Sequence, residues 1–139
     1  MFFAQRRGFH RLLDVGALVE MPSGGLTTLV KNIKGRPDEV KRIIRALQLA
    51  KREVLKAREK TLDLITRLLN MDKETAADTY KLVESNYNDT GVPTPEGMGN
   101  IIKAIRSEGR FKERNVSFEE VADPRLAIEV AKELGYKIP

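Results

Sequence analysis

The sequence contains no cysteine, no tryptophan and a single histidine among its 139 residues. Without cysteine, disulfides, thiolate metal sites and cysteine nucleophiles are excluded. With His10 as the only histidine, histidine-based metal clusters are excluded and a Ser-His-Asp triad is not expected. Aromatic residues make up only 6% of the chain, so the core must be aliphatic. No apolar run reaches 18 residues, so no segment is expected to span a bilayer.

Sequence motifs for phosphate, metal or cofactor chemistry are missing as well. The glycines follow neither the Walker spacing nor the Gly-x-Gly-x-x-Gly pattern. Glu119, Glu120 and Asp123 are close in sequence, but helix capping or solvent exposure accounts for each of them. We therefore predict no catalytic residue, no metal and no cofactor, and a protein that is not an enzyme.

The charge of the chain is concentrated in one segment. The formal net charge is +5, and residues 31–60 hold 11 basic and 4 acidic side chains. At helical spacing Lys41, Arg45, Arg52 and Lys56 share one edge, opposite an apolar stripe. A solvated helix face explains such an edge, and attraction to nucleic acid or to an acidic membrane is the alternative. Because no aromatic residues are interleaved with these cations, nucleic-acid binding is not expected.

Residues 1–34 differ from the rest of the chain. Pro22, Gly24 and Gly25 predict a turn, because proline fixes one dihedral angle and the glycines free the next ones. The β-branched content of the following Leu26-Thr27-Thr28-Leu29-Val30 favours a short strand. One or two short strands are therefore expected in this part of the chain.

After Gly35 the apolar residues recur at helical spacing to the end of the chain. Gly109 and Gly135 suit positions just past a helix C-terminus. The predicted fold is mostly α, with about six helices. Capping residues and prolines place their starts at Pro37, Thr61, Asp72, Thr94, Ser117 and Asp123.

Five stretches of the chain carry a family resemblance. They are residues 8–14 (GFHRLLD), 35–47 (GRPDEVKRIIRAL), 70–80 (NMDKETAADTY), 91–97 (GVPTPEG) and 121–127 (VADPRLA). In this order they resemble segments of the substrate-binding proteins of ABC transporters, in the nitrate/sulfonate/taurine group of the type 2 periplasmic binding proteins. The third stretch resembles the family helix that follows a Leu-Gly-Val-Asp motif.

The resemblance implies the C-terminal part of a two-lobe α/β receptor with a ligand cleft between its lobes. It divides the chain into a hinge-return segment, residues 1–34, and a C-terminal helical region, residues 35–139. Ser23 and Gly24 are implied as ligand-binding residues, because the hinge return should approach the cleft. A small-molecule ligand and an ABC permease are the implied partners, in the full-length context only. The resemblance implies a periplasmic or otherwise extracytoplasmic location, because such proteins are secreted to the periplasm or tethered to the outer face of the cell membrane.

Further expectations concern the chain by itself. Its first residues do not resemble a signal peptide, so as written it would stay in the cytoplasm. A chain that supplies only one wall of the cleft cannot enclose a small molecule, so we do not expect this chain to bind a transport substrate with useful affinity. Exposed apolar helix faces are expected to drive homo-oligomer formation. Two alternatives stay open: a helical interaction module that uses the basic helix, and a fragment of an enzyme that resembles those of thiamine-pyrimidine synthesis.

Overall fold

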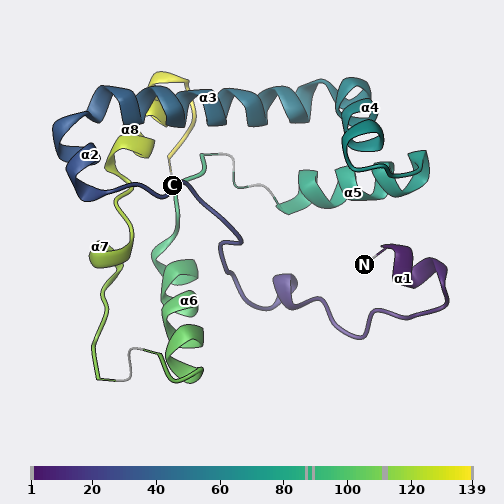
Figure 1. Ribbon diagram of the computed structural model, residues 1–139, viewed down its shortest axis with the longest axis horizontal. Coiled ribbons are helices and arrows are strands. Elements are labelled where there is room, and N and C mark those ends of the chain that lie inside the picture. The colour runs from purple at the N-terminus through teal and green to yellow at the C-terminus, as the bar shows by residue number, and fades with distance from the viewer. Residues whose placement is uncertain (1, 87, 89, 111–112, 139) are drawn as a thin grey trace. The chain divides into compact units, whose positions relative to one another are not determined.

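The computed structural model describes residues 2–86, 88, 90–110 and 113–138. The chain is 63% helical, with eight α-helices and no strand in the described part (Figure 1). The mostly-α class predicted from the sequence is confirmed. None of the helices in these residues is both long enough and apolar enough to cross a membrane.

The short strands predicted in residues 1–34 are wrong for the structure described. Residues 20–29 have no regular secondary structure, and helix α2 begins at Val30. Leu29 has an extended backbone, with φ −78° and ψ 142°. The local conformation is therefore strand-like at this residue, but a ladder needs a second strand, and none is found in the described residues.

The helices lie in two compact units, which are described separately. Unit 1 consists of residues 1–13 and 46–89, and unit 2 of residues 14–45 and 90–139. The division predicted between residues 34 and 35 stays a prediction. The elements are α1 (Phe2–Arg6), a 3-10 turn (Val15–Ala17), α2 (Val30–Gly35), α3 (Pro37–Lys56), α4 (Arg58–Leu68), α5 (Lys73–Asn86), α6 (Pro95–Ser107), α7 (Phe118–Val121) and α8 (Arg125–Glu133).

Most of the predicted helix boundaries follow from local capping, and the structure confirms them. Asp72 caps α5 by accepting a hydrogen bond from the Thr75 amide, and Ser117 and Glu120 form a capping box on α7. Gly109 and Gly135 have positive φ angles of 89° and 80°, as a residue after a helix requires.

The predicted start of the second helix at Thr61 is wrong. Helix α4 already begins at Arg58. Ala57, between α3 and α4, has the non-helical angles φ −97° and ψ 59° and separates the two helices. The Thr61 hydroxyl donates instead to the carbonyl of Val54, at 2.9 Å. The break at Ala57 removes the intrahelical donor for this carbonyl, and Thr61 replaces it.

Tyr80 makes the corresponding bond from α5 in the core of unit 1. Its hydroxyl donates to the carbonyl of Leu55, at 2.8 Å, and the residue is only 2% exposed. The guanidinium of Arg58 lies 5.7 Å from the centre of the Tyr80 ring, within cation–π range. Tyr80 therefore fills the core, terminates α3 and packs beneath the start of α4. Ala76, four residues earlier on the same face of α5, is also fully buried.

Helix α1 is held to α5 by one arginine and three carboxylates. The Arg6 guanidinium lies 2.9 Å from Asp72, 3.3 Å from Glu74 and 4.0 Å from Asp78. Hydrogen bonds from the Thr75 hydroxyl and amide, and then from Arg6, hold the pKa of Asp72 well below its usual range. The ionised form of Asp72 is therefore favoured by folding.

Replacing Asp72 by asparagine is expected to reduce the pH dependence of unit 1 unfolding. A lowered pKa in the folded state gives stability that is present above the unfolded pKa of about 4 and is lost as pH falls. The measurement is the midpoint temperature of thermal unfolding as a function of pH, from pH 6 to pH 2. In Asp63→Asn, at an exposed position of α4, this temperature should fall with pH as steeply as in the unchanged chain. Equal slopes for both variants would contradict this account.

In unit 2, α8 packs beside the first half of α3 through buried apolar residues and two ion pairs. Val130 and Ala131 of α8 are fully buried. The Lys41 ammonium lies 3.1 Å from the Glu129 carboxylate, and Arg45 pairs with Glu133 four residues further along both helices. Two of the four cations of the predicted basic edge are therefore occupied by partners within the chain.

Candidate functional site

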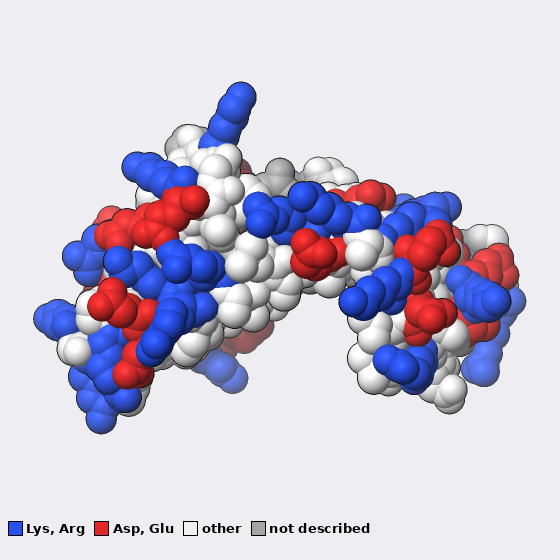
Figure 2. Space-filling model, turned by 90° about the horizontal axis from the view of Figure 1, so that it is seen from above, with Lys and Arg blue, Asp and Glu red and all other residues white. Residues whose placement is uncertain are grey.

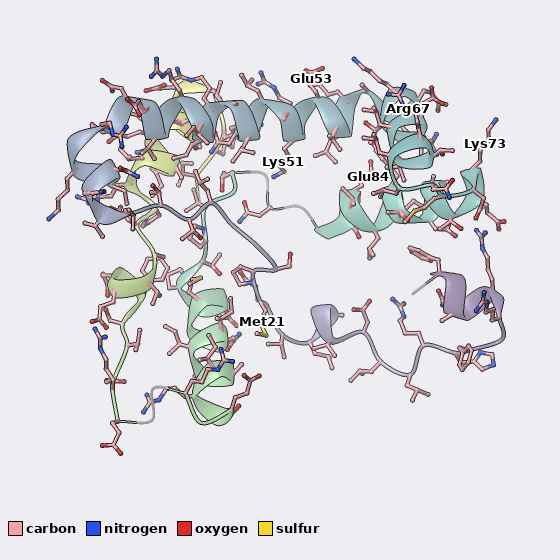
Figure 3. The ribbon with its side chains drawn as sticks, viewed as in Figure 1. Met21, Lys51, Glu53, Arg67, Lys73 and Glu84 are labelled. Atoms are coloured by element: carbon pink, nitrogen blue, oxygen red, sulfur yellow. The ribbon has the colours of Figure 1, made fainter. Side chains whose placement is uncertain are left out.

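The predicted ligand-binding residues Ser23 and Gly24 lie in an irregular segment of unit 2. We call residues 20–25 the strap. The strap runs beside α6, and Figure 3 labels Met21 within it. Ser23 and Gly24 are both exposed, and a side chain at Gly24 would meet nothing within 4 Å. Their place is therefore open, and their predicted role stays a prediction.

The N-terminus of α6 is the fixed part of this site. Thr94 is the N-cap, and its hydroxyl oxygen accepts a hydrogen bond from the Gly97 amide, at 3.0 Å. Pro95 occupies the first turn, where its missing N–H costs nothing. This local sequence orders the helix start without help from the rest of the chain.

Glu20 joins the strap to the start of α6. The Thr94 hydroxyl donates to the Glu20 carboxylate, and the Asn100 side-chain amide donates to the Glu20 backbone carbonyl, at 3.0 Å. A carboxylate beside a helix N-terminus is also stabilised by the positive end of the helix dipole. Glu20 thus attaches the strap, just ahead of Ser23, to the N-cap of α6 and to a residue six positions later, nearly two helix turns away.

Gly97 lets the strap approach α6 closely. A Cβ atom at this position would lie 2.9 Å from Cδ of Pro22 and 3.3 Å from the Glu20 carboxylate. Both distances are shorter than ordinary van der Waals contact between these atoms. Only a residue without a side chain fits here.

Glu20, Gly97 and Asn100 were not identified from the sequence as parts of one site. The available signal was a glycine in the first turn of a predicted helix, where alanine would be more stable. That signal indicates close backbone packing, but it does not name the packed segment. The contact joins residues more than 70 positions apart, so no local pattern reveals it.

Two small open clefts occur in unit 2, away from the strap. One of about 180 Å³ is lined by apolar residues of α6 and α7, including Ile102, Ile105 and Val121, with Arg106 and Arg114 beside them. The other, of about 220 Å³, lies between α2 and α8. Both are below the roughly 300–1,000 Å³ of typical ligand pockets. Neither includes Ser23 or Gly24 in its lining.

The acidic residues near α7 have structural partners. Glu120 accepts from the Ser117 amide at 3.0 Å and from Arg114 at 2.6 Å, and these bonds lower its pKa. Asp123 accepts two bonds from the Arg125 guanidinium, at 2.7 and 2.8 Å, which lower its pKa. Among the described residues, no three acidic or histidine side chains are grouped as metal ligands would be. His10 lies exposed in an irregular segment.

Comparison of the chain with known protein families, with curated proteins and with solved structures gives no match. Its function must therefore be inferred from its residues and their arrangement.

Proposed function

We propose that this chain is the C-terminal part of an ABC-transporter substrate-binding protein of the nitrate/sulfonate/taurine group. It is then a receptor for a small molecule and not an enzyme, and it acts outside the cytoplasm with a membrane permease. The observation that carries the proposal is the resemblance of five sequence stretches, in chain order from residue 8 to residue 127, to members of this family.

The surface of the chain supports a role as part of a larger protein. Its accessible surface is 10685 Å². Two separate globular units of the sizes found here would together expose roughly 8,700 Å² by the scaling of surface with mass. The excess, roughly 2,000 Å², is on the scale of a protein–protein interface. A receptor fragment that has lost its neighbouring lobe would expose such an area.

The exposed apolar side chains also support a role as part of a larger protein. Leu12 is 96% exposed, and Leu18 and Val30 are 67% and 65% exposed. Soluble proteins seldom leave several large apolar side chains of one segment in water unless another surface covers them. In the proposed receptor, the residues of the other lobe and of the hinge would cover residues 12–30.

In this proposal the strap forms one wall of the ligand cleft. The contacts of Glu20 with α6 fix its first residues, so that the Ser23 hydroxyl and the Gly24 backbone face solvent as hydrogen-bonding groups. The opposite wall belongs to the first lobe, and closure of the two walls would bury the ligand. The transported molecule is not defined by these residues.

The basic-helix alternative has less support. Lys41 and Arg45 are paired with acids of α8. Positive and negative side chains are interspersed over the face seen in Figure 2, so this face presents no continuous cationic surface. Binding to a polyanion depends on several unpaired cations acting together. The enzyme alternative has no candidate catalytic residue.

Isothermal titration with nitrate, alkyl sulfonates and pyrimidines is expected to show no binding to the 139-residue chain tighter than about 1 mM, because one wall leaves most of a ligand in water. The DNA upstream of the Met1 codon should encode an α/β lobe, and the longer protein should bind one of these ligands at micromolar concentration. Micromolar binding to the short chain, or an upstream sequence that encodes no such lobe, would contradict the proposal.

In the longer protein, Ser23→Ala should weaken ligand binding about tenfold, because it removes a hydroxyl that would hydrogen-bond to the ligand. Ser85→Ala on α5 should leave the ligand affinity unchanged.

A further inference from the structure

We propose that residues 23–29 are an unpaired β-strand, and that in the 139-residue chain this strand pairs antiparallel with the same segment of a second copy. The inference goes beyond the proposed function, since it concerns association of the chain with itself. In the larger receptor, residues of the rest of the protein would cover this segment. In the 139-residue chain, its backbone, its exposed apolar side chains and its charge pattern favour a second copy as the partner.

The backbone of this segment is the first reason. In the described part of the chain, no hydrogen bond uses the N–H or C=O groups of residues 21–28. Thr27 and Thr28 are β-branched and favour strands, and the apolar Leu26 and Leu29 flank them. Leu29 at its end has an extended backbone, and a segment with free N–H and C=O groups is a template for pairing with another strand.

The exposed apolar area is the second reason. Leu26 and Leu29 within the segment are 49% and 60% exposed, and Val30 directly after it is 65% exposed. Pairing with a second copy would cover apolar side chains that the single chain leaves in water.

Charge selects an identical segment in antiparallel orientation. Residues 21–30 contain no charged side chain, so two copies meet without repulsion. Glu20 precedes this uncharged stretch, and Lys31 and Lys34 follow it. Antiparallel pairing brings the acidic end of each copy to the basic end of the other, whereas parallel pairing brings like charges together. A twofold axis near Thr27 produces this arrangement and closes the dimer.

The contact between the strap and α6 limits the length of the paired strand. Pro22 has no N–H to donate and packs on Gly97, so pairing begins after it. At the other end, the N–H groups of Asn32 and Ile33 donate to the Leu29 carbonyl as α2 starts. Seven residues remain, and with the twofold axis at Thr27 the five from Gly25 to Leu29 pair between the copies, which is an ordinary strand length.

A single introduced cysteine tests the pairing, because the natural chain has none and any disulfide must join two copies. Opposite residues of an antiparallel pair have Cα atoms about 4.5–5.5 Å apart, within the range for a disulfide. Under mild oxidation, Thr27→Cys should form a covalent dimer at least tenfold faster than Glu84→Cys. Glu84 lies on α5 of unit 1, as labelled in Figure 3, and serves as the matched control.

Two further variants at Thr27 separate strand pairing from apolar association. Thr27→Pro removes one N–H donor and tolerates extended backbone, so the dimer dissociation constant measured by sedimentation should rise about 10- to 100-fold. Thr27→Val keeps the N–H and the β-branch, and its constant should equal that of the unchanged chain or be lower. Dimers of equal strength for the proline and valine variants, equal crosslinking rates for the two cysteines, or a monomer at all concentrations up to about 1 mM would each overturn the proposal.

Discussion

Replacing Tyr80 by alanine is expected to destabilise unit 1 by about 3–5 kcal/mol, as for other large buried aromatic residues. The side chain is 2% exposed, and it links α5 to the end of α3 through its bond to the Leu55 carbonyl. Its loss leaves a cavity and an unsatisfied carbonyl at the same place. A unit with a total stability of about 5–15 kcal/mol would lose a large part of it.

Hydrogen exchange locates this effect. In Tyr80→Ala, amides of α4 and α5 should exchange much faster, and those of α8 in unit 2 should change little. Tyr80→Phe is the matched control, because it keeps the ring and removes only the hydroxyl. Its cost should be about 1 kcal/mol. An alanine variant as stable as the phenylalanine variant would refute the role given to the ring.

The helical part of the fold could be predicted from the sequence because its signals are local. The pair Thr94 and Pro95 marks the start of α6, and the spacing of Ser117 and Glu120 marks α7. Each of these capping interactions joins residues within one helix turn, so the sequence alone is enough to predict it.

The predicted strand failed for the opposite reason. Residues 26–30 have strand propensity, but a strand is stabilised by hydrogen bonds to another strand, and the described residues supply none. Thr61 was misread on different grounds. Its hydroxyl suits an N-cap, but the break at Ala57 made the Val54 carbonyl a competing partner. Helices α1 and α2, with five and six residues, are too short to produce a periodic pattern.

The candidate site was predictable only in part. The resemblance implied Ser23 and Gly24 as ligand-binding residues; both are exposed in the structure, and their role stays a prediction. The attachment of Glu20 to Thr94 and Asn100 depends on tertiary packing, which one sequence does not encode in any local spacing. The basic edge of α3 shows the same limit, since the acids that pair with it lie more than 80 residues away.

The strap and α6 are held together closely enough that one methyl group should separate them. Gly97→Ala places a Cβ atom 2.9 Å from the Pro22 ring, and the ring cannot rotate away as a flexible side chain would. Overpacking of this kind costs about 1–3 kcal/mol, which exceeds the gain of up to about 1 kcal/mol from replacing a helical glycine by alanine. We expect a net loss of about 1 kcal/mol in the stability of unit 2.

Gly99→Ala, in the same helix, isolates the steric term. A Cβ atom at Gly99 meets nothing within 4 Å, so this variant should gain up to about 1 kcal/mol from helix propensity alone. Denaturant unfolding should therefore separate the two variants by about 2 kcal/mol. Amide exchange at residues 18–21 should accelerate in Gly97→Ala only, because the bonds of Glu20 to Thr94 and Asn100 require the close approach that the methyl group prevents. If both alanines raise the stability equally, the strap does not pack on α6 in solution, and Ser23 and Gly24 lose the support that fixes them beside the helix N-terminus.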